Sequence, residues 1–426
     1  MQGKATEPLA RRPPPPSDAS RRGVAEPSIV AMLTNGGFPH LLAEGRDDEA
    51  RGLASEALDR WVAAGLAHEI GPDGQRRFDP AEVVNGFKWA GLQERDSFWR
   101  EHWIATGRRL SGELALADAG WPVQANLVRT FDLGGLAEDA EILLRAPVPL
   151  AGPDHAVRSF APSGPPGARI DLSDGRLTAR LKRGALTCAT LSWSAKLEPG
   201  PAKDSAALSA EDAELYLRQA EGPVQVTPRI RALAEDWAAG RSGWEAAVAF
   251  RRRLGAGFCL GVVGYEAFEA RSALDWVLDH GWFDCLLGSA LLVSLCRARG
   301  IPARLVGGHF LYPLGPTNHS WAEVWADGRG WTPIDLAGWD LSAGDADAAW
   351  RDAFVGRVDC RLVTERPPRR VTGPMSLRLP LAWRMLQVAV EGGGVEISLV
   401  DAGAGRTVFS DSVRIALGPA AAAQAR

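Results

Sequence analysis

The 426-residue sequence has few cysteines, and their arrangement excludes two kinds of site. The five cysteines are widely scattered, and no two of them form a Cys-x-x-Cys pair, so neither a zinc knuckle nor a dithiol redox centre is indicated. Cys285 and Cys296 lie eleven residues apart on one predicted helix. That separation is a rise of about 16 Å, which no disulfide spans. The sequence therefore predicts free thiols and a cytoplasmic location.

Long apolar runs and an excess of charge are also absent. No stretch reaches the roughly 20 uninterrupted apolar residues that a membrane span needs. The N-terminal "MQGKATEPLARRPPPPSDASRRG" has arginine pairs but no apolar segment after them, so we predict a disordered tail over residues 1–26 and no secretory signal. The formal net charge of -4 gives no reason to expect nucleic acid or an anionic membrane as a partner.

Metal-ligand patterns are missing as well. Cys259, His280 and His309 lack the spacing of a metal site, and no acidic loop resembles a calcium site. We therefore expect no metal and no cofactor.

Length and composition predict a globular chain of two to four domains, with 46% apolar and 23% charged residues. Helical spacing, as in "LASEALDRWVAAGLAHEI", predicts a helical N-terminal domain, in which "LAHEIGPDGQRRFD" has the pattern of a small wing-like hairpin. Alternating stretches such as "ARIDLSDGRLTARLKRG" predict a β-rich domain after it. The predicted boundaries are 27–120 for the helical domain, 121–204 for the β-rich domain, 205–365 for a mixed domain and 366–426 for a small C-terminal β-rich segment.

The stretch "GWFDCLLGSALLVSLCRARGIPAR", residues 281–304, places a cysteine at the start of an apolar helix. Apolar residues continue at helical spacing behind Cys285, and Gly300 and Pro302 end the pattern. In the first turn of a helix, free N–H groups and the positive end of the dipole favour a thiolate and can hold an oxyanion. Cys285 is therefore a candidate nucleophile. The alternative is a structural core cysteine, which is our interpretation of Cys296.

A base for this thiol is offered by the stretch "NHSWAEVWADGRGWTPIDLAGW". On a strand, His319, Trp321 and Glu323 share one face, and an Asp-Gly turn then leads into a second strand with Asp335. Two residues that lie opposite each other across this hairpin have numbers with a constant sum. His319 and Asp335 lie on the same face only if that sum is even, for example 656. This parity requires an odd-length or bulged loop with glycine at positive φ.

In that register the carboxylate of Asp335 can fix the tautomer of His319. We expect both side chains to face the N-terminal end of the cysteine helix, with the sulfur within about 4 Å of a ring nitrogen. A histidine that only packs across the strands is the alternative.

These stretches resemble the transglutaminase-like family of papain-like cysteine enzymes, in the bacterial type that carries a β-sandwich before its catalytic domain. The resemblance runs from the helix ending in "RARGIPARLVGG" through "HSWAEVW" to "GWTPIDLA", and it covers about residues 210–365. It implies an α+β fold: a papain-like transglutaminase core preceded by a helical domain and a β-sandwich and followed by a small β-rich tail. In one position the chain departs from the family, because Phe283 stands where members commonly have glycine, two residues before the nucleophile.

The resemblance implies acyl transfer with Cys285 as nucleophile, His319 as base and acid, and Asp335 as orienting carboxylate. The acyl donor would be a peptide or small-molecule amide or thioester, including thioesters on carrier proteins, and an amine or water would accept the acyl group. The residues leave open whether the outcome is amide-bond formation or hydrolysis by an amidase or peptidase. A non-catalytic transglutaminase-like scaffold that binds a peptide or protein partner is the third alternative, and the presence of all three triad residues argues against it.

Three further residues are candidates for substrate binding. Glu323 shares the strand face of His319, and the alternative for it is an exposed strand carboxylate. Trp282 and Trp321 could line a substrate groove, whereas core packing is the simpler interpretation of a tryptophan.

Overall fold

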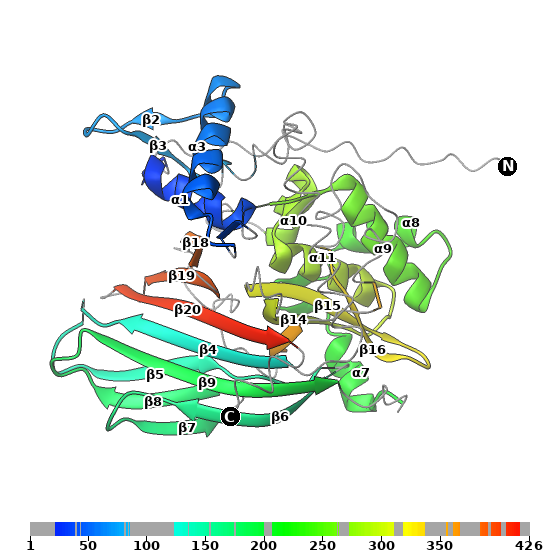
Figure 1. The fold of residues 1–426 in the computed structure, drawn as a ribbon. Helices are drawn as coiled ribbons and strands as arrows, with labels where there is room; N and C mark the ends of the chain where they lie inside the picture. Colours follow the sequence, from blue (N-terminus) through cyan, green and yellow to red (C-terminus); the bar gives the residue numbers. More distant parts are fainter. Residues whose placement is uncertain are drawn as a thin grey trace.

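The computed structural model describes the chain in segments, drawn as helices and strands in Figure 1. The described residues are 22–38, 41–42, 44–80, 82–83, 85, 123–134, 136–152, 155–173, 176–199, 207–261, 263, 272–310, 318–336, 355–356, 361–366, 384–390, 393–401 and 406–417. The predicted disorder over residues 1–21 lies outside them, as does Cys360. Among these segments no helix combines the length and apolarity that crossing a bilayer requires.

The N-terminal part is a small helical module, at the upper left of Figure 1. Its three-stranded sheet has the order β1-β3-β2, and the antiparallel β2–β3 pair is the wing-like hairpin that the sequence predicts. A buried cluster that includes Trp61 and Phe78 forms its core. The module begins slightly before the predicted residue 27. Its elements are β1 (Val24–Ala25), α1 (Glu26–Gly37), α3 (Asp47–Ala63), β2 (Glu69–Ile70) and β3 (Arg76–Phe78).

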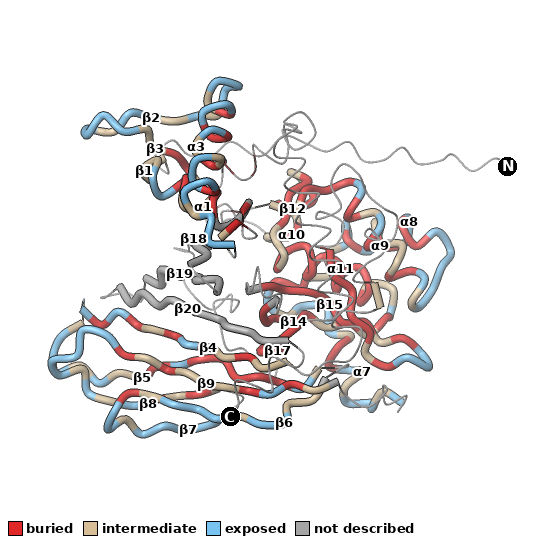
Figure 2. Tube along the Cα trace, in the orientation of Figure 1, coloured by how far each residue is buried: buried red, intermediate tan, exposed pale blue. Residues whose placement is uncertain are grey.

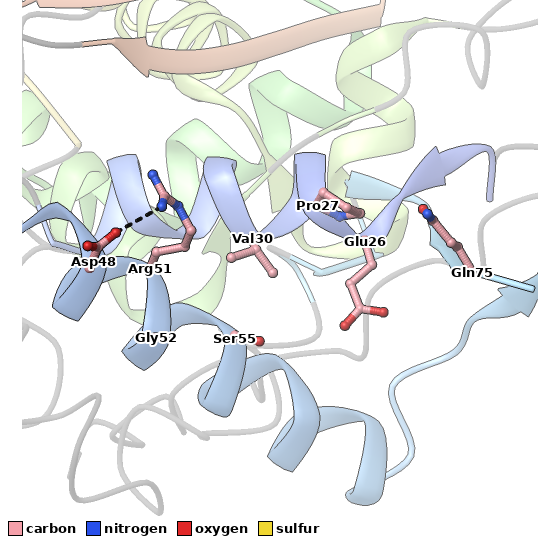
Figure 3. A pocket seen from close by; sticks show the side chains of 8 residues that line it. All are labelled: Glu26, Pro27, Val30, Asp48, Arg51, Gly52, Ser55 and Gln75. Carbon is pink, nitrogen blue, oxygen red and sulfur yellow. Dashed lines mark hydrogen bonds and ion pairs between the residues drawn. The ribbon is translucent and has the colours of Figure 1, made fainter.

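A cleft of about 580 Å³ lies between the two helices of this module (Figure 3). Its three charged groups are paired: Glu26 accepts from Arg76 at 2.7 Å, and Asp48 accepts from Arg51 at 3.2 Å. None of the lining residues is a candidate site residue. They are Glu26, Pro27, Val30, Asp48, Arg51, Gly52, Ser55 and Gln75.

Two sheets form the sandwich, and the C-terminal strands belong to it. The larger sheet has the order β18-β19-β20-β4-β9-β6, and the smaller has the order β5-β8-β7. The sequence predicts 366–426 as a separate β-rich segment, whereas β20 pairs with β4 from Val408↔Asp132 to Leu417↔Val123. The strands are β4 (Val123–Asp132), β5 (Glu141–Pro147), β6 (His155–Ser163), β7 (Arg169–Ser173), β8 (Arg176–Lys182), β9 (Cys188–Pro199), β18 (Arg384–Val390), β19 (Gly393–Asp401) and β20 (Arg406–Leu417).

The third part packs helices against a four-stranded sheet of order β16-β15-β14-β17. Side-chain caps start several of its helices; among them, Ser209 accepts from Asp212 N–H and Thr227 accepts from Ile230 N–H. Its elements are α7 (Ala210–Tyr216), β10 (Ala220–Glu221), β11 (Val224–Gln225), α8 (Pro228–Ala238), α9 (Gly243–Gly257), β12 (Cys259–Leu260), α10 (Ala273–His280), β13 (Trp282–Phe283), α11 (Cys285–Ala298), β14 (Ala303–Phe310), β15 (Asn318–Ala326), β16 (Gly330–Ile334) and β17 (Arg361–Glu365).

The four-stranded sheet is covered on both faces. Ala322 and Val324 of β15 lie in the core cluster of the helices, whereas Trp321 and Val363 lie in the core cluster of the sandwich. A backbone hydrogen bond of 2.7 Å from Leu150 to Val363 also joins the sandwich to β17. The mixed α+β class is thus confirmed. The parts predicted on either side of residue 204 share a hydrophobic core, because the sheet between them is apolar on both faces.

Candidate active site

Cys285 is the first residue of α11, as the sequence predicts. Asp284 is the N-cap, and its carboxylate accepts a hydrogen bond from Leu287 N–H at 2.8 Å, which starts the helix at the cysteine. The following residues, Leu286 to Arg297, are all buried, and the helix is coloured accordingly in Figure 2. Cys285 itself is only partly buried. The thiol therefore stands at the end of a helix whose body is fixed in the core.

β15 and β16 form the predicted hairpin in the predicted register. Ala326 pairs with Gly330, and the paired numbers sum to 656 along the whole ladder. The turn over 327–329 has three residues, and Gly328 and Gly330 have φ values of 71° and 70°. Glycine adopts this left-handed conformation without a steric penalty, and the odd loop length keeps odd-numbered side chains on one face. The prediction of an odd loop with glycine at positive φ is confirmed.

The structure brings His319 and Asp335 together. Nε2 of His319 lies 2.9 Å from both Oδ1 and Oδ2 of Asp335, and both side chains are buried. Because Nε2 faces the carboxylate, Nδ1 is the ring nitrogen suited to exchange a proton with a thiol. Arg361, the first residue of β17, also donates from Nη2 to Oδ2 of Asp335 at 2.8 Å. The buried carboxylate thus lies beside a guanidinium as well as an imidazole.

Cys285 meets β15 at Ser320, the residue after His319. The N–H and the hydroxyl of Ser320 hydrogen-bond to the Cys285 sulfur, and the hydroxyl of Ser289, one helical turn later, donates to the Ser320 carbonyl at 3.2 Å. The ladder between β15 and β16 ends at the pair Ala322 and Ile334, so β16 does not pair with Ser320. The N–H and C=O of Ser320 point to the same side of the strand, as they do in any strand residue. The first turn of α11 therefore docks on the edge of β15 that β16 leaves open.

The His–Asp pair faces the sandwich, which differs from the expectation that it faces the cysteine helix. Trp321 belongs to the core of the sandwich, and strand side chains alternate, so His319 is on the same face. The two rings stack with centroids 6.3 Å apart. The charge of Asp335 reaches the Cys285 thiol from this face, because it contributes to the raised pKa of the thiol. The sulfur-to-nitrogen separation of about 4 Å stays a prediction.

Burial and the neighbouring Asp284 carboxylate raise the pKa of the Cys285 thiol to about 12, although hydrogen bonds from Ser320 lower it. The sequence predicts the opposite direction, because the first turn of a helix favours a thiolate. Withdrawal of the sulfur from water and the carboxylate beside it oppose the effect of the helix N-terminus on the thiol. At neutral pH the resting side chain is a thiol, and it needs a base before it can attack.

Replacing Asp284 by asparagine is expected to lower the pKa of Cys285, because asparagine caps a helix as well as aspartate does but carries no charge. The measurement is the rate of alkylation of Cys285 by iodoacetamide as a function of pH, followed by mass spectrometry. The profile of Asp284→Asn should move to lower pH, while that of exposed Cys188 in the same chain stays in place. A Cys285 profile at the wild-type position would show that the Asp284 charge does not influence the thiol.

The three candidates for substrate binding are deeply buried. Trp282 lies in the core of the helices, and Trp321 lies between His319 and the sandwich. The Glu323 carboxylate is 0% exposed and accepts from Arg304 Nε at 2.7 Å, so the alternative of an exposed strand carboxylate is wrong. Side chains buried this deeply offer no surface to a substrate, and packing is the role that the structure supports. In the described segments no group of three or more His, Cys, Asp or Glu side chains is arranged to hold a metal ion.

Sequence reasoning missed four residues of this arrangement, Asp284, Ser289, Ser320 and Arg361. A signal for Asp284 was present, since an aspartate directly before an apolar helix is typical of an N-cap. Arg361 had none, because it lies 26 positions from Asp335 and reaches it only through the pairing of β14 with β17.

One family model matches part of the chain. A family model described as the transglutaminase-like superfamily matches residues 246–336, a range that contains Cys285, His319 and Asp335. No curated protein matches the sequence significantly. A candidate cysteine protease from Cytophaga hutchinsonii is 13% identical with a TM-score of 0.44, over 70% of this chain and 91% of that one. The periplasmic domain of TgpA from Pseudomonas aeruginosa is 17% identical with a TM-score of 0.30, over 56% of this chain and 96% of that one.

Proposed function

Because the chain contains a domain of the transglutaminase-like superfamily, we propose that it is a cysteine-dependent acyl-transfer enzyme acting through Cys285, His319 and Asp335. One observation carries the proposal. Asp335 engages Nε2 of His319 at 2.9 Å, and the next residue along the strand, Ser320, hydrogen-bonds to the Cys285 sulfur. A carboxylate, an imidazole and a thiol in this order are the groups that activate a sulfur nucleophile.

The first half-reaction acylates the enzyme. Nδ1 of His319 takes the proton of the Cys285 thiol as the sulfur attacks the carbonyl carbon of an amide or thioester. Because burial raises the pKa of the thiol, the attack needs this base. The N–H of Cys285, in the first turn of α11, is the donor that we assign to the developing oxyanion. The bond to the leaving group then breaks, His319 returns the proton to the departing amine or thiolate, and an acyl-thioester remains on Cys285.

The second half-reaction decides the product. His319 takes a proton from an amine or a water molecule as that acceptor attacks the acyl-thioester; the C–S bond then breaks, His319 gives the proton to the Cys285 sulfur, and an amide or an acid leaves. Amide-bond formation and hydrolysis by an amidase or peptidase therefore use the same three residues and differ only in the acceptor. A peptide, a small molecule or a carrier-protein thioester would each present a suitable carbonyl as donor. The location in the cytoplasm stays a prediction.

The non-catalytic scaffold is the competing function, and a test of covalent chemistry separates the two. The full chain is incubated with N-acetylcysteamine thioesters, acyl p-nitroanilides and glutamine peptides, each with and without a primary amine. We expect the mass of the acyl group on the peptide that contains Cys285, and no such adduct in Cys285→Ala. Adducts only on other cysteines, or turnover by Cys285→Ala equal to that of the wild type, would refute the proposal. A folded wild type that forms no adduct with any member of the panel would favour the scaffold.

A further inference from the structure

Arg361 reaches the candidate triad from the opposite edge of the sheet. Asp335 follows β16, the strand at one edge, whereas Arg361 begins β17, the strand at the other edge. β14 lies between β15 and β17, and its residue opposite His319 is Gly308, which has no side chain. The Arg361 guanidinium lies over the Trp321 ring at 5.9 Å and donates to Asp335 at 2.8 Å. The arginine thus binds the carboxylate on the same sheet face as the histidine.

The Arg361–Asp335 pair is buried, with exposed side-chain fractions of 2% and 1%. A buried carboxylate is costly without a countercharge. In the proposed reaction His319 alternates between neutral and charged forms and supplies a positive charge only in part of the cycle. An arginine is charged at every pH at which a protein is folded. Arg361 is therefore the permanent countercharge of Asp335.

We propose that Arg361 is a positioning residue of this site: its charge keeps Asp335 ionised and limits how readily the Cys285–His319 pair takes up a proton. The inference rests on the proposed function. An unpaired buried carboxylate would hold the neighbouring imidazole in its protonated form, in which it cannot act as a base. A guanidinium on the same carboxylate offsets that attraction. The imidazole then stays available as a base, while the carboxylate still fixes its orientation.

Other charged and titratable groups lie on the elements around this pair. Asp284 caps α11 and Cys285 begins it, and Glu323 and Arg304 pair with each other beyond Trp321 on the same sheet face. The remaining ones among the described residues of these strands are His309 of β14, Glu365 of β17 and Arg366 directly after it.

The test removes the charge of Arg361 and follows the proton affinity of the Cys285–His319 pair. In the full-length chain, alkylation of Cys285 by iodoacetamide is measured against pH for wild type, Arg361→Gln and Arg361→Lys. Glutamine keeps an N–H donor without charge, and loss of a positive charge makes the pair bind protons more readily. The Arg361→Gln profile is expected to move to higher pH by about one unit. The Arg361→Lys profile should stay near the wild type, because the charge is kept.

A matched control is Arg304→Gln, which removes the charge from another arginine–carboxylate pair of the same sheet, in which the carboxylate is buried and the arginine partly buried. It should destabilise the fold without moving the Cys285 profile. An Arg361→Gln profile that overlays the wild type, or equal shifts in Arg361→Gln and Arg361→Lys, would overturn the inference. If Arg361→Gln does not fold, Asp335→Asn is compared with Asp335→Asn/Arg361→Gln. The double variant leaves neither charge buried, and its profile must then lie at higher pH than that of Asp335→Asn.

Failure of this inference is distinguishable from failure of the proposed function. Alkylation by iodoacetamide needs no acyl substrate, so the profile reports on Arg361 whether or not a substrate has been found. A wild type without an acyl-enzyme refutes the function, and an unshifted Arg361→Gln profile refutes the positioning role alone.

Discussion

In Asp335→Asn the turnover is expected to fall by about four orders of magnitude. Asparagine has nearly the shape of aspartate, but its amide can present an N–H to Nε2 of His319, which selects the wrong tautomer, and it cannot stabilise the imidazolium. The Nε2 atom contacts both carboxylate oxygens at 2.9 Å, so either orientation of the amide weakens the pair. The measurement is steady-state turnover of whichever donor acylates Cys285. Turnover within tenfold of the wild type would remove Asp335 from the triad.

Stability provides the control for this prediction. Asp335→Asn leaves the buried Arg361 without its carboxylate, and breaking a buried ion pair costs about 3–5 kcal/mol. Chemical denaturation should detect that loss. In the double variant Asp335→Asn/Arg361→Gln no uncompensated charge is buried, so stability should recover in part while turnover stays low. Recovery of both quantities together would mean that Asp335→Asn is inactive only because it is unfolded.

Gly308→Ala is expected to destabilise the chain by about 3 kcal/mol. A Cβ atom at this position would lie 1.7 Å from the carbonyl oxygen of Leu362 and 3.0 Å from the ring of Trp321. The first contact is with backbone, so no rotamer change relieves it, and β14 has to move away from β17. Because Gly308 pairs with His319 and β17 carries Arg361, the movement should also lower activity. Chemical denaturation and turnover are the two measurements.

A glycine in open surroundings is the matched control. Gly52 lies in α3, where a Cβ atom would have no neighbour within 4 Å. Gly52→Ala should raise stability by up to about 1 kcal/mol, because alanine favours a helix and restricts the unfolded chain. If Gly308→Ala were as stable as Gly52→Ala, the close approach of β14 to β17 would not be required by the fold.

The local features of the candidate site were determined by the sequence. Helical spacing after Cys285 and the stop at Gly300 and Pro302 define α11, and these signals act within a few residues of one another. The parity of the β15–β16 register follows from the Asp-Gly turn and the glycine after it, since side-chain alternation links the loop length to the face of every residue. For this reason the pairing of His319 with Asp335 could be predicted without coordinates.

Only the tertiary structure decided the surroundings of that pair. β20 joins β4 across most of the chain, and the sandwich covers the His319 face through Trp321 and Val363. The raised pKa of Cys285 depends on how deeply the first turn of α11 is buried, and the contact of Arg361 with Asp335 depends on the position of β17. Burial and strand order come from contacts between residues far apart in the sequence, whereas periodicity and turn chemistry report only on near neighbours. The proposed triad could thus be predicted from the sequence, but its electrostatics could not.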